Sequence, residues 1–140
     1  MHTQLHDFEQ FMKRREDAAS AYVKGDSHPL SQMVATISPA TFFGPKGGFR
    51  EGASNVASTY DHDATVFQPE GESSFDVLQS AASGDIAYWV GFQWVKARLK
   101  GSTTTVPMKL RVTEVFCHEE GEWKLVHRHA DTLATEEKRK

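Results

Sequence analysis

The chain has 140 residues, 39% of them hydrophobic and 25% charged, with a formal net charge of −3. This length and composition predict one globular domain with a core of its own, and they exclude disordered, collagenous and membrane-spanning classes. The small negative charge provides no basic surface for nucleic acid or for an anionic membrane.

Hydrophobic periodicity predicts three helices in the first half of the chain, at residues 5–24, 28–37 and about 52–60. In the first helix, the charged run from Lys13 to Asp17 is expected to face solvent. Pro29 lies in the first turn of the second helix, whose core face extends to Ile37. A short extended segment at 41–43 and a loop rich in glycine and proline at 44–48 separate the second helix from the third.

The second half of the chain predicts strands. Runs of β-branched and aromatic residues occupy 64–68, 73–82, 85–99, 104–118 and 122–131, with turn residues between them. Short connections favour antiparallel pairing of successive strands, and helices followed by strands indicate an α+β fold. The domain is expected to span 1–135, with residues 136–140 as a solvated charged tail.

The strand at 85–99 carries large apolar side chains on both faces. Three helices can cover only one face of a sheet, so we predict a homodimer through the other face. Cys117 is the only cysteine, so no internal disulfide is expected, and the charged N-terminal residues do not form a signal peptide. We therefore expect a cytoplasmic protein, and we predict no cofactor because no cofactor-binding motif is present.

The C-terminal segments resemble the last hairpin of SnoaL-like proteins, which belong to the nuclear transport factor 2-like superfamily. Residues 110–116, the turn at 119–122 and residues 123–131 carry the likeness, including the pattern Trp-x-x-Val-His-x-His. The order of the helices and of the 40–45 segment agrees, so the resemblance covers essentially the whole chain. It implies three N-terminal helices packed on a strongly curved, mostly antiparallel sheet that forms a cone with an apolar pocket for a small organic molecule.

The same superfamily contains ketosteroid isomerases, polyketide cyclases and the association domain of calcium/calmodulin-dependent kinase, so the fold alone does not determine function. The isomerases carry their basic Asp where this chain has Gly44, and their oxyanion-hole Tyr aligns with Ala18. Classical steroid isomerisation is therefore disfavoured. The arginine-lined pocket of the association domain is not reproduced either, and Arg111 and Arg128 are the cations that remain to hold a carboxylate.

The residues expected to line the pocket are Phe43, Tyr60, Trp89, Trp94, Arg111, Glu114 and Arg128. Glu114 beside Arg128 is either a general base with a pKa raised by burial or a structural ion pair, and the ion pair is favoured. His62 and His129 are the other acid–base candidates. His62 lies between Asp61 and Asp63 in a predicted turn, where these residue types are ordinary.

The histidines of the last strand can also be interpreted as metal ligands. His127, His129 and Asp131 alternate along one face with the spacing of metal ligands. We nevertheless predict no metal and expect Trp123, His127 and His129 to pack at the dimer seam, as the resemblance implies. Two functions remain open: a binding protein for a small organic ligand, with or without isomerase-, cyclase- or dehydratase-type proton transfer, and a non-catalytic oligomerisation module.

Overall fold

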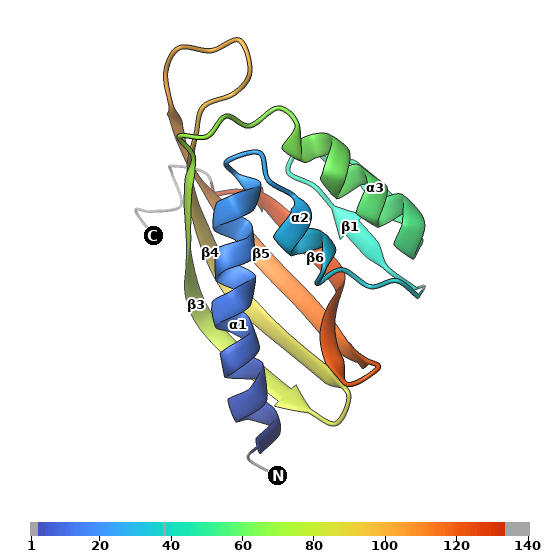
Figure 1. Cartoon of the computed structure of the whole chain (residues 1–140). Coiled ribbons are helices and arrows are strands. Elements are labelled where there is room, and N and C mark those ends of the chain that lie inside the picture. Colours follow the sequence, from blue (N-terminus) through green and yellow to red (C-terminus); the bar gives the residue numbers. More distant parts are fainter. Residues whose placement is uncertain (1–2, 38, 134–140) are drawn as a thin grey trace.

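The computed structural model describes residues 3–37 and 39–133, and the tail predicted at 136–140 lies outside them. Three helices precede most of the sheet (Figure 1): α1 (Thr3–Tyr22), α2 (His28–Ser31) and α3 (Ala53–Ala64). The strands are β1 (Thr41–Phe43), β2 (Phe49–Glu51), β3 (Glu72–Ser83), β4 (Ile86–Ala97), β5 (Val106–Glu119) and β6 (Glu122–Thr132).

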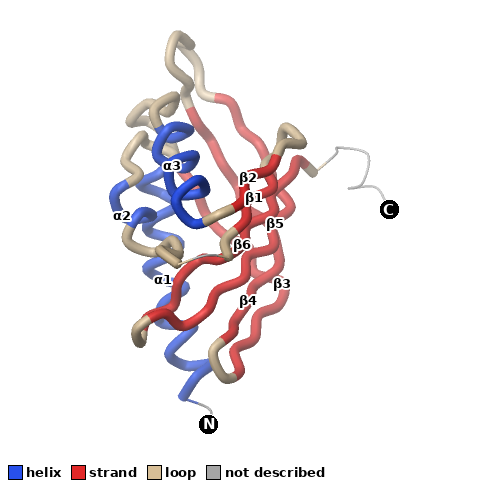
Figure 2. Tube along the Cα trace, turned by 90° about the vertical axis from the view of Figure 1, so that its right-hand side faces the viewer, coloured by secondary structure: helices blue, strands red, loops and turns tan. Residues whose placement is uncertain are grey.

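The strands form one six-stranded sheet in the order β2-β1-β6-β5-β4-β3. All neighbours pair antiparallel except β1 and β6, which are parallel. The three helices lie on one side of this curved sheet (Figure 2). We call the helix-covered side the inner face and the opposite side the outer face. The predicted α+β fold, with helices on one face of a curved and mostly antiparallel sheet, is confirmed.

Two bulges bend the sheet. The pairing of β3 with β4 shifts register between Val77 and Gln79, and the pairing of β5 with β6 shifts between Val115 and Phe116. An extra residue in one strand increases the local twist and coiling. Gly91 lies opposite the first bulge, where a Cβ atom would stand 2.1 Å from the Asp76 carbonyl oxygen. Only glycine permits this approach of the two backbones.

Helix α1 is attached to the edge strand β3 by polar side chains as well as by its apolar stripe. Glu16 accepts a hydrogen bond from the Phe75 amide at 2.7 Å, and the Ser20 hydroxyl donates to the Ser73 carbonyl at 3.1 Å. Lys24, just beyond the helix, donates to the Gly71 carbonyl at 2.6 Å. Side chains four residues apart share one helix face, so this row pairs backbone groups that an edge strand otherwise leaves open.

The second and third helices differ from prediction. Helix α2 has one turn only, because Val34 forms a parallel bridge to Leu125 and the Ala35 amide bonds the Leu125 carbonyl. Ile37, predicted to lie in the core, is 63% exposed. Helix α3 continues to Ala64, so the predicted strand at 64–68 is wrong.

Near the β1–β2 hairpin, prediction and structure agree in part. The extended segment at 41–43 is confirmed as β1, and the loop at 44–48 is closed by a bond from the Gly44 amide to the Gly48 carbonyl. Strand β2, at 49–51, was not predicted. Within the described residues, no helix has both the length and the apolar character that crossing a membrane requires.

Candidate functional site

A buried carboxylate on the inner face organises the candidate site. Glu114 of β5 is 0% exposed and accepts hydrogen bonds from three side chains. Arg15 of α1 binds it through Nε at 3.0 Å and Nη2 at 2.7 Å, and Arg128 of β6 through Nη1 at 2.6 Å. The indole Nε1 of Trp89, on β4, donates to the same carboxylate at 2.8 Å. One helix and three neighbouring strands therefore meet at this carboxylate. We call the residues around it the inner cluster: Arg15, Trp89, Gln93, Glu114 and Arg128.

The inner cluster extends toward the edge strand β3. Arg128 Nη2 donates to Gln93 Oε1 at 2.6 Å, and Gln93 Nε2 donates to the Ser73 hydroxyl at 2.9 Å. The ring of Phe75 stacks on Trp89 with centroids 4.5 Å apart and lies 5.5 Å from the Arg15 guanidinium carbon. The guanidinium is thus held between a carboxylate and an aromatic face, a combination that suits arginine.

Electrostatics keep Glu114 ionised at neutral pH. Burial by itself raises the pKa of this carboxyl, but Arg15 and Arg128 outweigh burial and lower the pKa to about 2. The alternative of a general base with a raised pKa is therefore wrong, and the favoured ion pair between Glu114 and Arg128 is confirmed. Two guanidiniums surround one carboxylate, so the inner cluster carries one excess positive charge.

Two donors beside this charge have no hydrogen-bond partner among the described residues: Arg15 Nη1 and the Tyr60 hydroxyl. Tyr60 is 4% exposed, and burial raises the pKa of its hydroxyl well above the ordinary value, with Arg128 and Glu114 acting on it in opposite senses. Two rings pack against Tyr60, with the Phe42 centroid 4.9 Å and the Tyr22 centroid 6.4 Å away, and the ring of Phe67 packs in turn against Tyr22 at 5.7 Å. Buried donors are nearly always paired, so these two mark a place where a partner is expected.

Arg15, which contributes two of the hydrogen bonds to Glu114, was assigned to the solvent side of α1, and this prediction is wrong. It is 3% exposed. The signal was in the spacing, because Arg15 follows Phe11 by four residues and precedes Ala18 by three, which puts it in the apolar stripe of the helix. Because Arg15 lies within a run of charged residues, its residue type alone did not indicate that it is buried.

The predicted pocket residues are divided between the two faces of the sheet. Tyr60, Trp89, Glu114 and Arg128 come together on the inner face, whereas Phe43, Trp94 and Arg111 lie on the outer face. Trp94 is 46% exposed, and Lys109 Nζ stands 4.2 Å from its ring centre. Arg111 forms a bidentate pair with Asp131, at 2.6 and 2.9 Å. These outer residues therefore cannot line a pocket together with Tyr60.

The bulge in the last hairpin separates residues that were predicted to share a face. Val115 pairs with His127 but Phe116 pairs with Leu125, so Val126 is the extra residue. Trp123 consequently points inward, where it is 4% exposed and packs 5.6 Å from Phe8. His127 and His129 point outward. Their assignment to a dimer seam stays a prediction, and Trp123 does not belong with them.

The remaining acid–base candidates lie away from the inner cluster. His62 is exposed in the last turn of α3, while Asp61 beside it accepts a bond from the Ser27 hydroxyl at 2.9 Å. His129 is half-exposed, and its Nε2 lies 3.6 Å from Asp131 Oδ2. Among residues 3–37 and 39–133, no three His, Cys, Asp or Glu side chains are grouped so that they could hold a metal ion.

The helix-covered curved sheet, with polar groups converging on its inner face, defines the nuclear transport factor 2-like class of α+β proteins. More particularly, residues 11–134 match the SnoaL-like domain family, and the chain belongs to that family. A search of curated proteins gave no significant match.

Solved structures share the fold at low sequence identity. A nuclear transport factor 2-like superfamily protein from Salmonella enterica serovar Typhimurium is 18% identical with a TM-score of 0.78, covering 95% of this chain and 93% of its own. A protein with a cystatin-like fold from Caulobacter vibrioides is 9% identical with a TM-score of 0.75, covering 98% and 94%. The association domain of CaMKII from C. elegans is 14% identical with a TM-score of 0.68, covering 94% and 100%. At these identities the likeness establishes the fold and nothing finer.

Proposed function

We propose that this SnoaL-like protein binds a small organic carboxylate on its inner face and holds it without converting it. The observation that carries the proposal is the pair of unpartnered buried donors, Arg15 Nη1 and the Tyr60 hydroxyl, which lack a partner among the described residues and lie beside a cluster with one excess positive charge. A carboxylate would accept hydrogen bonds from both donors and neutralise the charge, whereas a neutral ligand would accept the hydrogen bonds but leave the charge in place.

The charge states of the inner cluster support binding over proton transfer. A general acid or base works best with a pKa near the pH at which the protein operates. The pKa of Glu114 is lowered to about 2, and the pKa values of Tyr22 and Tyr60 are raised by burial. Arginine keeps its proton throughout. These groups can fix a ligand by hydrogen bonds and charge, but they are poorly matched to carrying a proton at neutral pH.

The ligand body is expected to be apolar and to lie among aromatic rings. Tyr22 and Phe42, whose rings pack against Tyr60, are partly exposed, and so is Phe67, which packs against Tyr22. Rotation of these rings would open a path to the Tyr60 hydroxyl, and an apolar ligand would replace the ring contacts that are lost. Polar groups that fix orientation within an apolar lining are the usual composition of a small-molecule site.

The test compares two tyrosines by calorimetry and native mass spectrometry against a panel of small carboxylates. The variant Tyr60→Phe removes the unpartnered hydroxyl, and it should weaken binding by about ten-fold, the worth of one hydrogen bond to a charged group. Tyr88→Phe is the matched control, because the Tyr88 hydroxyl bonds Gln79 on the outer face. If no carboxylate binds, or if the two variants bind equally, the proposal fails.

Self-association through the outer face is a second candidate function. Ile86 and Trp94 are 54% and 46% exposed on the outer face of the sheet, which no helix covers, and exposed apolar surface of this kind is typical of an interface. The fold likeness to an association domain favours the same reading. Native mass spectrometry would give a dimer or a larger ring, and Ile86→Asp should reduce that mass to the monomer. A monomeric wild-type protein would exclude this function.

A further inference from the structure

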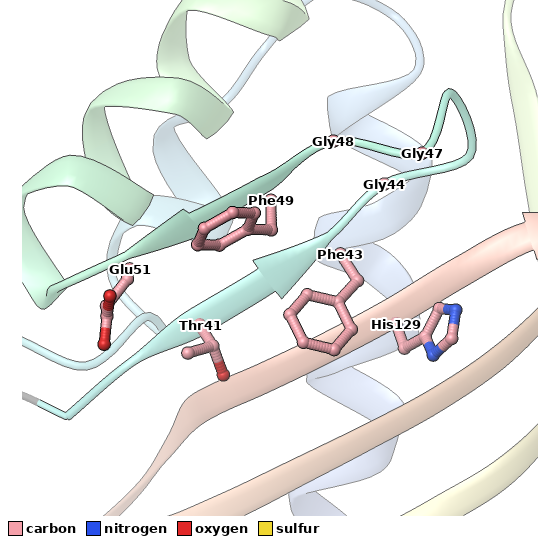
Figure 3. A pocket seen from close by; sticks show the side chains of 8 residues that line it. All are labelled: Thr41, Phe43, Gly44, Gly47, Gly48, Phe49, Glu51 and His129. Carbon is pink, nitrogen blue, oxygen red and sulfur yellow. The ribbon is translucent and has the colours of Figure 1, made fainter.

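The outer face carries a groove at the edge where the β1–β2 hairpin meets β6. Its volume is about 550 Å³, and its lining residues are Thr41, Phe43, Gly44, Gly47, Gly48, Phe49, Glu51 and His129. Figure 3 shows the two phenylalanine rings and the imidazole of His129 on the same side of the strands, with the three glycines in the hairpin loop beyond them. The groove lies on the opposite face of the sheet from the inner cluster, so a role for the groove is independent of carboxylate binding on the inner face.

Strand register explains how these side chains come together. Phe43 pairs with Phe49 of β2 and with His129 of β6, so these three residues form one row across the strands. Thr41 pairs with Glu51 and with His127, which form the next row on the same face. The Phe43 ring meets Phe49 at 87° with centroids 6.5 Å apart and meets His129 at 73° and 5.5 Å.

The glycines leave the groove open. A Cβ atom at Gly47 or Gly48 would meet no heavy atom within 4 Å. Gly47 has a positive φ of 90° and is needed for the turn, whereas Gly48 does not have a positive φ. Phe43 is 41% exposed and Phe49 is 62% exposed, so two aromatic rings face a space that no side chain of the loop occupies.

The charge of the groove is negative. Glu51 is the one carboxylate among the eight lining residues, none of which is Lys or Arg. The described residues contain no ion pair of Glu51, while the other polar groups nearby are engaged: the Thr41 hydroxyl lies 2.7 Å from His127 Nδ1, and Asp131 is held by Arg111. The groove thus combines aromatic rings with a carboxylate that no described cation neutralises.

We propose that this groove is a second binding site, for a small organic ammonium ion with an aromatic or aliphatic body. The Glu51 carboxylate pairs with the ammonium group, and the rings of Phe43 and Phe49 contact both the body and the cation, since aromatic faces attract ammonium groups. The volume lies within the range of small-molecule sites. Negative charge in the lining selects a cation against an organic anion of the same shape, which distinguishes this groove from the positively charged inner cluster.

The experiment is an NMR titration of the full chain with two probes of similar shape and opposite charge. Phenethylammonium should produce saturable amide shifts within residues 41–51 and at His129. 3-Phenylpropanoate should not shift these amides, although carboxylate binding on the inner face predicts that it shifts those near Tyr60. The two proposals can therefore succeed or fail separately. No saturable shift with phenethylammonium, or equal shifts at the groove with both probes, overturns the proposal.

Variants make the assignment specific. Glu51→Gln keeps the shape and should weaken phenethylammonium binding about five-fold, the worth of one exposed ion pair. Glu72→Gln, an exposed carboxylate on β3, changes the net charge equally and should leave binding unaltered. Gly48→Leu fills the groove without backbone strain and should abolish binding while the fold is kept. If Phe49→Asp instead converts a dimer into a monomer and wild-type groove amides do not respond to the probe, the groove is a contact between copies and the proposal is wrong.

Discussion

Two arginine–carboxylate pairs of similar geometry lie on opposite faces of the same sheet. On the inner face, Arg15 binds Glu114 through Nε and Nη2 at 3.0 and 2.7 Å. On the outer face, Arg111 binds Asp131 through the same two atoms at 2.6 and 2.9 Å. The inner pair is 3% and 0% exposed, and the outer pair 51% and 33%. The bond lengths are alike, but the inner pair is buried and its carboxylate also accepts from Trp89 and Arg128.

Burial changes what each pair does for the protein. The outer pair is hydrated whether or not it forms, so it contributes little net free energy. Each inner partner has lost its water, and removal of one leaves the other charged and unpaired in a low-dielectric interior. The inner cluster is thus a point at which the fold can be broken by a single change, and the outer face is a surface that tolerates substitution.

The largest expected effect is the loss of the inner carboxylate. Glu114→Gln leaves Arg15 and Arg128 without their counter-ion, and we expect the free energy of unfolding to fall by about 3–5 kcal/mol. Asp131→Asn, the matched change on the outer face, should cost less than about 1 kcal/mol. Urea unfolding followed by tryptophan fluorescence measures both. Similar losses for the two variants would contradict the contrast between the faces.

The same carboxylate should make stability depend on pH. Its pKa is about 2 in the folded protein against 4.5 for an ordinary glutamate. At pH values between these limits the unfolded chain binds more protons than the folded one, so stability rises with pH. The contribution, on the order of 3 kcal/mol, is complete above about pH 5 and is lost as pH falls toward 2.

Urea unfolding at pH 6, 4 and 3 tests this dependence. Wild type should lose stability along the series, and Glu114→Gln should lose less, because its residue 114 does not titrate. The pKa of Asp131 is also lowered, by its bond from Arg111, but this group titrates in both proteins and cancels in the difference. Parallel curves for wild type and variant would show that Glu114 is not the titrating group.

The contrast between the faces also shows what the sequence could predict. The α+β order, the long antiparallel strands and helix α1 follow from periodicities of 3.6 and 2, and the C-terminal pattern of Trp123, His127 and His129 supports the family. The pair of Glu114 and Arg128 could be predicted too, because both lie in regular segments of the last hairpin, where side chains alternate without interruption.

The wrong predictions arose where one residue departs from the regular alternation or spacing of side chains in its element. The bulge at Val126 has no signature in side-chain type, so counting by twos from Trp123 puts His127 on the wrong face. Aromatic character alone did not reveal that Phe43 and Trp94 lie outside. Arg15 was hidden by its charged neighbours, although its helical spacing from Phe11 marked it as buried. The order of the elements could therefore be predicted from the sequence, whereas the face on which a side chain lies could be learned only from the structure.

Two tryptophans on β4 allow a smaller test of the same contrast. Trp89 is fully buried, stacks on Phe75 and donates to Glu114 at 2.8 Å, whereas Trp94 is 46% exposed on the outer face. Trp89→Phe removes the donor and part of the packing, so it should lower the free energy of unfolding by about 2 kcal/mol. Trp94→Phe should change it by about 0.5 kcal/mol or less. Thermal unfolding by circular dichroism would report both, and a reversed order would mean that the outer face is covered in solution.

The smallest expected effect has the opposite sign. The Tyr60 hydroxyl is buried without a hydrogen-bond partner among the described residues, and such a group costs stability because it has lost water and gained nothing. Tyr60→Phe should therefore leave the free energy of unfolding unchanged or raise it by up to about 1 kcal/mol. Tyr88→Phe should lower it slightly, because that hydroxyl bonds Gln79 at 2.8 Å. Urea unfolding of the two variants beside wild type measures both changes.

This small gain would connect stability to the proposed binding role. A destabilising hydroxyl that is retained on the inner face fits a role in binding, since functional sites often trade stability for activity. A clear loss of stability in Tyr60→Phe would mean that the hydroxyl already has a partner in the free protein, such as an internal water. The inner face would then be a satisfied core, and a carboxylate ligand would have one donor fewer to bind.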